Sequence, residues 1–449
     1  MENIVVFGKA HSGKSTLIGY ILSRQNKSFA AEDRKLRAEL GENYEPSYMY
    51  SYIVDDSKYE QNNASKKPGT RNLHIRKTSL PTGQQVTLID TPGFDNLKRP
   101  KAKGAFFADI GVFCLEMHDV TSDDFLANFA EHSSVMSSLM LWSYFDRKRI
   151  IVALTKADLS NYSEEEFEAA KEKVYAICNA AHIESILVIP TVVLVDERID
   201  HNVVEKSDLL SWFDGPTLCE AISREIQNCS NERGDELLFC IDRQVAHPKL
   251  QTGKIWTIKI IQGKLSLNDD IILSPVLTID RKFVDISARV KKIRYDVHKT
   301  EEYEEIQTAY PGSIVGIDLR DVYANGRKIS KKDFNTLYTT CGFHKDVRFI
   351  VSSMLRFAVS SEHKEEFTAR RQFSLIWFGR GITFSVLKSY EDTADRMIVE
   401  AKITPRKITL PINAEGNYYF TSLLIKDENG EFDNQYYDAE LIGLIEEGE

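Results

Sequence analysis

The sequence lacks the long apolar runs of a membrane protein, the signal peptide of a secreted protein and the cysteine or histidine clusters of a metal site. No apolar run approaches the roughly eighteen residues that a membrane span requires. The first apolar run begins at Ile4, so we expect no signal peptide. The 6 cysteines are scattered without a C-x-x-C pair, and no histidines cluster at metal-ligand spacing. We therefore expect reduced, mostly buried thiols in a cytoplasmic protein that has no membrane partner.

An excess of positive charge is also missing, because the formal net charge is −10 at pH 7. Non-specific nucleic-acid binding is driven by basic surface, so this charge argues against a protein that coats nucleic acid. An acidic chain can still carry a local basic stripe that binds RNA. With 449 residues, 42% of them hydrophobic, the chain is long enough to bury the cores of two or three globular domains.

The first clear motif is a phosphate-binding loop. Gly8 to Ser15 reads G-x-x-x-x-G-K-S, between the apolar, strand-like residues 4–7 and the helix-forming residues 16–22. Glycines in such a loop let backbone N–H groups turn toward a diphosphate, and the N-terminus of the following helix adds favourable charge. Lys14 is placed to reach the β- and γ-phosphates, and the Ser15 hydroxyl is placed to bind Mg²⁺.

A second motif, D-T-P-G, follows the strand-like residues 86–89. In a nucleotide-hydrolysing domain its aspartate, Asp90, holds the metal through water, and the N–H group of Gly93 meets the γ-phosphate. Such a loop responds to the presence of the third phosphate. The segment before this strand should supply a threonine whose hydroxyl binds Mg²⁺ only in the triphosphate state, and Thr70 is the candidate.

A third motif, T-K-A-D at residues 155–158, follows the strand-like residues 150–154. Asp158 can accept two hydrogen bonds from the N1–H and 2-amino groups of guanine, which adenine does not supply. The stem of Lys156 is expected to pack over the base. Three motifs in this order, each at the end of a strand, predict a guanine-nucleotide switch domain that binds GTP or GDP with Mg²⁺.

The pattern of helices and strands divides the chain into three parts. Residues 1–229 alternate strands and helices, with one helix expected at 31–40, inside a long insertion, and another expected after a capping box that begins at Ser163. The rest of the sequence consists of strands and turns. We predict an α/β P-loop GTPase domain at 1–229, followed by two all-β barrel domains at 236–340 and 341–449.

Together the motifs resemble those of the translation-factor GTPases, of the elongation factor Tu and elongation factor one-alpha type. The similar branch holds elongation factor one-alpha, the release-factor and ribosome-rescue GTPases, and the GTPase subunit of sulfate adenylyltransferase. The resemblance rests on S-G-K-S-T at 12–16, W-F-D-G-P-T-L at 212–218 and P-G-S-I-V-G at 311–316. It covers nearly the whole chain and is weakest toward the C-terminal end. It implies a ribosome, a tRNA or another protein as partner.

The chain departs from the family pattern within the nucleotide site. Phe94 replaces the water-orienting histidine that follows D-x-P-G, and a phenyl ring neither donates nor accepts a proton. His11 stands where the family has an aspartate implicated in holding a monovalent cation. Thr70 follows a glycine directly, in G-T-R rather than G-I-T. Thr191 and Val192 stand where the family has a serine-containing loop at the guanine edge, and the backbone N–H of Val192 could serve instead.

Two roles are open for His11: a solvent-facing loop residue, or an imidazolium near the phosphates that partly replaces the missing cation. No other residue is assigned to catalysis. The residues expected to bind the guanine nucleotide are Gly8, His11, Ser12, Gly13, Lys14, Ser15, Thr16, Asp90, Gly93, Thr155, Lys156, Asp158, Thr191 and Val192. The residues expected to bind Mg²⁺ are Ser15, Thr70 and Asp90.

The sequence leaves three functions open. The first is a divergent GTP-binding molecular switch of translation-factor type, whose intrinsic hydrolysis is slow or lost because Phe94 replaces the histidine. The second is a GTPase that regulates a metabolic enzyme, such as a sulfate-activating complex, and that would have a tightly bound partner subunit. The third is a non-translating scaffold that retains nucleotide for stability. Intact Lys14, Asp90 and Asp158 argue against a complete loss of nucleotide binding.

Overall fold

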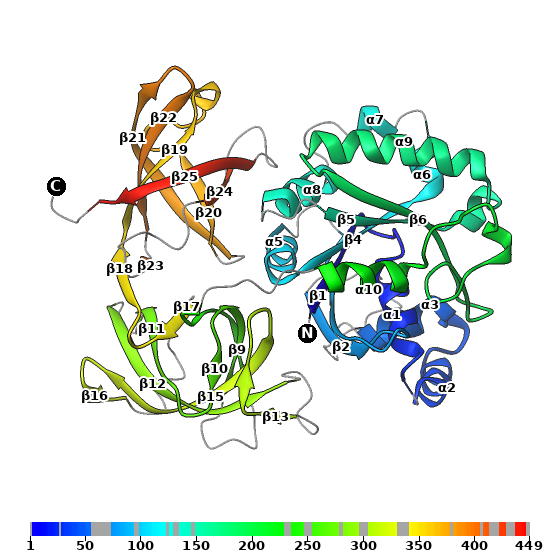
Figure 1. The fold of residues 1–449 in the computed structure, drawn as a ribbon, viewed down its shortest axis with the longest axis horizontal. Coiled ribbons are helices and arrows are strands. Elements are labelled where there is room, and N and C mark those ends of the chain that lie inside the picture. The colour runs from blue at the N-terminus through cyan, green and yellow to red at the C-terminus, as the bar shows by residue number, and fades with distance from the viewer. Residues whose placement is uncertain are drawn as a thin grey trace. The chain divides into compact units, whose positions relative to one another are not determined.

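The chain forms two compact units, Met1–Ser230 and Asn231–Glu449 (Figure 1). The first unit mixes helices and strands, and the second consists almost entirely of strands. A computed structural model describes residues 2–26, 28–54, 73–93, 98–122, 125–128, 134–144, 149–228, 235–246, 254–277, 282–295, 304–329, 341–377, 380–404, 407–412, 422–427 and 436–445.

A seven-stranded sheet forms the centre of the first unit, in the order β2-β3-β1-β4-β5-β6-β7. The inner strands run parallel, whereas β2 and β7 pair antiparallel at the edges. Because parallel strands end at one edge of a sheet, the three sequence motifs, which follow β1, β3 and β5, meet there. The strands are β1 (Glu2–Gly8), β2 (His74–Ser79), β3 (Gln85–Asp90), β4 (Ile110–Glu116), β5 (Arg149–Thr155), β6 (Ser185–Leu194) and β7 (Ile199–His201).

Helices cover both faces of this sheet (Figure 1). The expected helix at 31–40 is confirmed within α2, and the expected cap is confirmed at α9, where the Ser163 hydroxyl accepts from the Glu166 backbone N–H at 3.2 Å. The helices are α1 (Lys14–Ser23), α2 (Phe29–Leu40), α3 (Pro46–Val54), α5 (Lys98–Phe107), α6 (Met117–Thr121), α7 (Phe125–Asn128), α8 (Ser134–Tyr144), α9 (Glu164–Ala180) and α10 (Leu218–Asn228). Short 3₁₀ turns are η1 (Gly41–Asn43), η2 (Ala157–Ser160) and η3 (Asp208–Leu210).

One strand of the sheet is longer than the sequence predicts. β6 continues to Leu194, through Thr191 and Val192, which the sequence predicted to lie in a loop. Threonine and valine favour extended backbone, and residues 192–194 gain a partner because they pair with β7. The stretch expected to be a loop at the guanine edge is therefore strand, with Thr191 and Val192 both buried.

The second unit begins with a closed ring of six strands, in the order β8-β9-β15-β12-β11-β17. Apolar side chains fill its interior, among them Trp256, Ile258 and Ile260. The strands are β8 (Leu238–Ala246), β9 (Lys254–Gln262), β11 (Asp270–Leu277), β12 (Phe283–Arg294), β15 (Ile314–Ala324) and β17 (Cys341–His344), with the short β10 (Leu265–Ser266), β13 (Glu305–Ile306), β14 (Thr308–Ala309) and β16 (Arg327–Lys328). The border predicted at residue 340 falls directly before β17 and stays a prediction.

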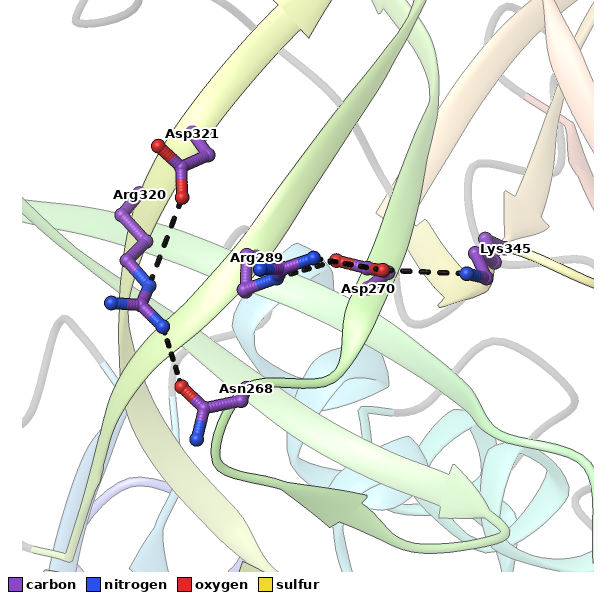
Figure 2. A network of polar contacts seen from close by, with 6 residues as sticks. All are labelled: Asn268, Asp270, Arg289, Arg320, Asp321 and Lys345. Carbon is purple, nitrogen blue, oxygen red and sulfur yellow. Dashed lines mark hydrogen bonds and ion pairs between the residues drawn. The ribbon is translucent and has the colours of Figure 1, made fainter.

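A polar network joins three strands of this barrel at its surface (Figure 2). Arg289 of β12 donates to Asp270 of β11 through Nε at 2.7 Å and through Nη2 at 3.2 Å, and Lys345 donates to the same carboxylate at 3.3 Å. Arg289 holds the pKa of Asp270 below its usual range. Arg320 of β15 lies directly opposite Arg289 and donates to Asn268 at 2.6 Å. The acceptors offset the repulsion between the two opposed arginines. The contacts therefore permit β12 and β15 to pair in this register but add little to the free energy of unfolding.

A second closed barrel follows, in the order β19-β22-β21-β20-β24-β25. Stacked and edge-to-face aromatic rings fill it, with Phe367 and Phe373 stacked at 4.5 Å between centroids. The strands are β19 (Met354–Ser360), β20 (Gln372–Trp377), β21 (Arg380–Thr393), β22 (Arg396–Ile403), β24 (Ser422–Asp427) and β25 (Tyr436–Leu444), beside the pair β18 (Arg348–Ser352) and β23 (Ile408–Ile412) and the 3₁₀ turn η4 (Ser361–His363). The predicted fold class, an α/β domain followed by two all-β barrels, is confirmed.

Among the described residues, no helix is long and apolar enough to cross a membrane. Nor, within that part of the chain, do three or more His, Cys, Asp or Glu side chains gather as they would around a metal ion. The described cysteines are buried thiols, as expected, and Cys229 lies outside the described residues. Burial raises the pKa of Cys114, Cys178 and Cys219 to about 12, so these thiols are unreactive.

Candidate functional site

The loop between β1 and α1 depends on two glycines, one of which also lies too close to a neighbouring strand for any side chain. Gly8 has φ 143°, and a Cβ at this position would lie 2.3 Å from the backbone oxygen of Cys114. Gly13 has φ 84°, but a Cβ there would meet its nearest neighbour, the Thr155 side chain, at 3.7 Å. Gly8 is therefore required both by its backbone conformation and by a close approach to β4, whereas Gly13 is required by backbone conformation alone. His11, also in this loop, has φ 67° and is exposed.

Lys14 opens α1 with its side chain folded into the loop. The residue is only 5% exposed, and its Nζ donates to the backbone oxygen of Lys9 at 2.6 Å. Burial lowers the pKa of Lys14, and the nearby Asp90 and Cys114 oppose this effect. A buried ammonium at the N-terminus of a helix attracts an anion strongly, because both the charge and the free backbone N–H groups favour one.

The ends of β1 and β3 meet through Ser15 and Asp90. The Ser15 hydroxyl donates to Oδ2 of Asp90 at 2.7 Å, and Asp90 is buried. Gly93 lies directly against the loop, because a Cβ there would be 2.5 Å from the Ala10 nitrogen, which itself donates to the Gly93 oxygen at 3.1 Å. The structure thus brings the first two motifs into contact. Thr70 and Phe94 lie outside the described residues, so their predicted roles stay predictions.

Thr155 joins the third motif to the first. Its hydroxyl lies 2.9 Å from the backbone oxygen of Ser12 and 3.1 Å from that of Leu115, and both oxygens are acceptors for its proton. Thr155 is buried, so this contact is shielded from water. The third motif therefore has a fixed position beside the phosphate-binding loop.

The next residues of this motif present two charged groups. Lys156 has φ 58°, in the left-handed region, and its ammonium donates to Oε2 of Glu116 at 2.6 Å. Asp158 is half-buried at the start of η2, and its carboxylate accepts no hydrogen bond from any residue in the described part of the chain. Its acceptor oxygens are therefore available to a ligand, as guanine recognition requires.

The remaining residues predicted to bind the nucleotide lie at the start of α1 and in β6. Ser12 is buried and Thr16 is half-buried on α1. Thr191 stands beside Thr155 in the parallel register of β5 and β6, and its hydroxyl donates to the Leu154 oxygen at 3.4 Å. Val192 is a buried residue of β6 opposite His201 of β7.

The sequence motifs did not reveal how the insertion after α1 is held. Asp33 of α2 has a side chain only 4% exposed, yet it accepts from Arg198 at 2.6 Å, from Arg37 at 3.0 Å and from the Tyr44 hydroxyl. Arg198 comes from the turn between β6 and β7. A buried carboxylate needs such partners, so the cluster fixes α2 beside that turn.

A second contact holds α3 against α1. A Cβ on Gly19 would lie 2.4 Å from the Tyr50 backbone oxygen, so the two helices approach each other as closely as their backbones permit. A glycine inside a helix is the one sequence signal that could have predicted this contact. Nothing comparable marks the contact of Asp33 with Arg198 or that of Glu116 with Lys156, because these partners are distant along the chain.

Comparison with known proteins agrees with this arrangement. The family model described as "Elongation factor Tu GTP binding domain" matches residues 1–344. Elongation factor 1-alpha of Pyrococcus horikoshii is 28% identical over 327 residues, which are 73% of this chain and 69% of that protein. Elongation factor 1-alpha of Archaeoglobus fulgidus is 27% identical over 333 residues, which are 74% of this chain and 69% of that protein.

Solved structures share the fold along the whole chain. The GTPase-like domain of S. cerevisiae Ski7, bound to GTP, superposes with a TM-score of 0.75 at 15% identity and covers 98% of this chain and 96% of that one. The elongation factor SelB of Methanococcus maripaludis, with the GTP analogue GppNHp, superposes with a TM-score of 0.59 at 15% identity and covers 98% and 78%. The family match covers most of the chain, so the protein belongs to the elongation factor Tu GTP-binding family, as a divergent member of the translation-factor GTPases.

Proposed function

We propose that the protein is a molecular switch of translation-factor type that holds GTP or GDP with Mg²⁺ and hydrolyses GTP slowly without a partner. The observation that carries this proposal is the arrangement of three strand ends at one sheet edge. Lys14 lies inside the loop after β1, Ser15 faces Asp90, and the Asp158 carboxylate accepts no hydrogen bond from the described residues.

The phosphates are expected to lie over the loop from Gly8 to Ser15. Backbone N–H groups at the start of α1 and the Lys14 ammonium supply the attraction. Because burial lowers the pKa of Lys14 in the free protein, an anionic ligand relieves an existing desolvation cost. Gly93 packs against Ala10, and we expect a third phosphate to change its contacts.

Ser15 and Asp90 are the residues that would hold Mg²⁺, with Thr70 as the third proposed ligand. A hydroxyl and a carboxylate are oxygen ligands of the kind that Mg²⁺ binds, and 2.7 Å between the two oxygens lets both reach one ion directly or through water. When bound, Mg²⁺ neutralises charge on the phosphate oxygens.

The base is expected to lie against η2. Asp158 accepts from the guanine N1–H and 2-amino groups, and the methylene stem of Lys156 covers the face of the ring. Thr155 keeps this recognition loop at a fixed distance from the phosphate loop through the Ser12 oxygen. His11, exposed in the loop, is the remaining candidate for a charge near the phosphates.

Binding is tested by titrating fluorescent GTP and ATP analogues with Mg²⁺. We expect the wild type to prefer GTP, and we expect Lys14→Ala and Ser15→Ala to weaken binding while circular dichroism shows the fold intact. Equal affinity for the two bases would contradict the guanine assignment. Normal affinity in both variants would show that the loop does not bind phosphate.

Slow hydrolysis is proposed because Phe94 replaces a water-orienting histidine. Such an imidazole contributes about 10²–10⁴-fold to the rate. We expect Phe94→His to raise single-turnover hydrolysis in the presence of the partner that engages the switch. Wild-type turnover of about 1 s⁻¹ or faster without a partner would contradict the proposal. In that case His11→Ala would have to abolish the rate for His11 to be the replacement.

A ribosome or a tRNA is the proposed partner, because the matched relatives are named elongation factors. Copurification of the untagged protein from its native cell, with mass spectrometry of bound RNA and protein, tests this directly. Ribosomal RNA or tRNA in stoichiometric amount would support it. A stoichiometric metabolic enzyme subunit without RNA would instead favour the regulatory function.

A further inference from the structure

The ammonium of Lys156 is held by a residue that no sequence motif includes. It donates to Glu116, the last residue of β4, at 2.6 Å. Glu116 stands directly beside Thr155 in the parallel register of β4 and β5. Its side chain is 18% exposed, against 37% for Lys156, so the contact is partly shielded from water. The carboxylate thus belongs to the sheet edge where the three motifs meet.

The backbone of Lys156 is fixed as well. Its φ of 58° places it in the left-handed region, and the preceding Thr155 donates to backbone oxygens of Ser12 and Leu115. A lysine side chain normally samples many rotamers. Here the fixed backbone beside Thr155 and the ion pair with Glu116 hold the methylene stem between the recognition loop and β4.

We propose that Glu116 is a positioning residue for purine recognition: it holds the Lys156 ammonium so that the stem is already in place to cover the face of a guanine bound by Asp158. The inference rests on the proposed guanine-nucleotide site. Glu116 does not touch the base in this account and acts only through Lys156. Its contribution is to order a flexible side chain before the ligand arrives.

The expected size of the effect follows from the cost of ordering one long side chain during binding. That cost corresponds to roughly threefold to tenfold in affinity. The pair is partly exposed, and such ion pairs contribute little to folding. Loss of Glu116 should therefore weaken base binding while leaving the thermal midpoint nearly unchanged.

The test measures binding of GDP and of inorganic pyrophosphate to the full chain with Mg²⁺. Glu116→Ala should bind GDP roughly threefold to tenfold more weakly and bind pyrophosphate as the wild type does. Glu116→Gln, whose amide oxygen still accepts from Lys156, should recover most of the GDP affinity. Glu205→Ala is the matched control, because Glu205 pairs with Arg24 at the same 2.6 Å separation elsewhere in the unit, and it should leave GDP binding unchanged.

A double-mutant cycle with Lys156→Met separates positioning from a general structural role. In the Lys156→Met background, Glu116→Ala should have no further effect on GDP affinity. Additive losses, an equal loss for pyrophosphate, or a wild-type affinity in Glu116→Ala would overturn the inference while the guanine site stands. A wild type that binds neither GDP nor pyrophosphate would overturn the proposed function and this inference with it.

Discussion

The phosphate end and the base end of the proposed nucleotide site differ in the contacts that their side chains already make. At the phosphate end the polar groups contact one another: Lys14 donates to the Lys9 oxygen, and Ser15 donates to Asp90. At the base end the Asp158 carboxylate accepts nothing from the described residues, while Lys156 is already held by Glu116. A ligand therefore exchanges contacts at one end and adds contacts at the other.

Because of this difference, we expect the choice between guanine and adenine to depend on the base end rather than on the phosphate end. Where contacts are exchanged, the net gain is small for each hydrogen bond and depends on the geometry of the backbone. Where contacts are added to a waiting acceptor, the wrong ligand leaves that acceptor unpaired, so discrimination is large. Backbone changes should damage the phosphate end, and side-chain changes should alter the choice of base.

The largest effect is expected at the phosphate end, from Gly8→Ala. The new Cβ would lie 2.3 Å from the Cys114 oxygen, so β1 or β4 must move, at a cost of about 3 kcal/mol or more in the free energy of unfolding. Gly13→Ala is the matched control. Gly13 has φ 84° but room for a methyl group, so only backbone strain should lower its free energy of unfolding, by about 1–2 kcal/mol. Urea denaturation measures both, and equal losses would contradict the distinction between the two glycines.

At the base end, Asp158→Asn should abolish the preference for guanine without unfolding the protein. The amide offers one acceptor oxygen and a donor that faces the guanine donors, and the loss should be about 2–3 kcal/mol in GDP affinity. Competition between GDP and ADP measures the change. Inorganic pyrophosphate should bind as before, because Asp158 does not reach the phosphates. A comparable loss of pyrophosphate affinity would show that the two ends are not separate.

Removing the contact that joins the two ends should have an intermediate effect on stability. Thr155→Val keeps the shape of the side chain but removes the hydroxyl 2.9 Å from the Ser12 oxygen, which costs about 1–2 kcal/mol of stability. Thr191→Val removes a buried hydroxyl whose bond to the Leu154 oxygen is longer, at 3.4 Å, and should cost less. If both variants lose the same stability in urea denaturation, the shorter contact has no special role.

The smallest effect concerns the protonation of Lys14. Burial lowers its pKa below 10.5, so the unfolded chain binds more protons than the folded chain as pH rises from the lowered value to 10.5. Across this window the stability of wild type should increase relative to Lys14→Met, by at most about 1.4 kcal/mol per pH unit. Urea denaturation of both proteins at several alkaline pH values measures it. A difference that is constant with pH would contradict the direction of the shift.

The parts of the fold that the sequence predicted are those encoded locally. The loop from Gly8 to Ser15, the strand before Asp90 and the cap at Ser163 each depend on neighbouring residues, and each lies where it was expected. The alternation of strands and helices followed by strands alone was enough to predict the order of domain types.

The parts that the sequence did not predict depend on distant partners. The extension of β6 to Leu194 needs β7, and the position of Glu116 matters only because β4 and β5 are neighbours. The helix α3 packs closely against Gly19 of α1, and Asp33 contacts Arg198 only in the folded chain. Periodicity and motif spacing carry no information about such pairs.

The buried Asp33 cluster has a consequence for exchanging segments between relatives. Residues 28–54 look like a module that could be transplanted, since they form a contiguous pair of helices after α1. One of the two arginines that pair with their buried carboxylate lies 165 positions farther along the chain, and their close fit to α1 requires Gly19. A graft that brings Asp33 without Arg198 would keep Arg37 and Tyr44 as partners but lose the shorter of the two ion pairs of a buried carboxylate, so a chimera should transfer the turn and the insertion together.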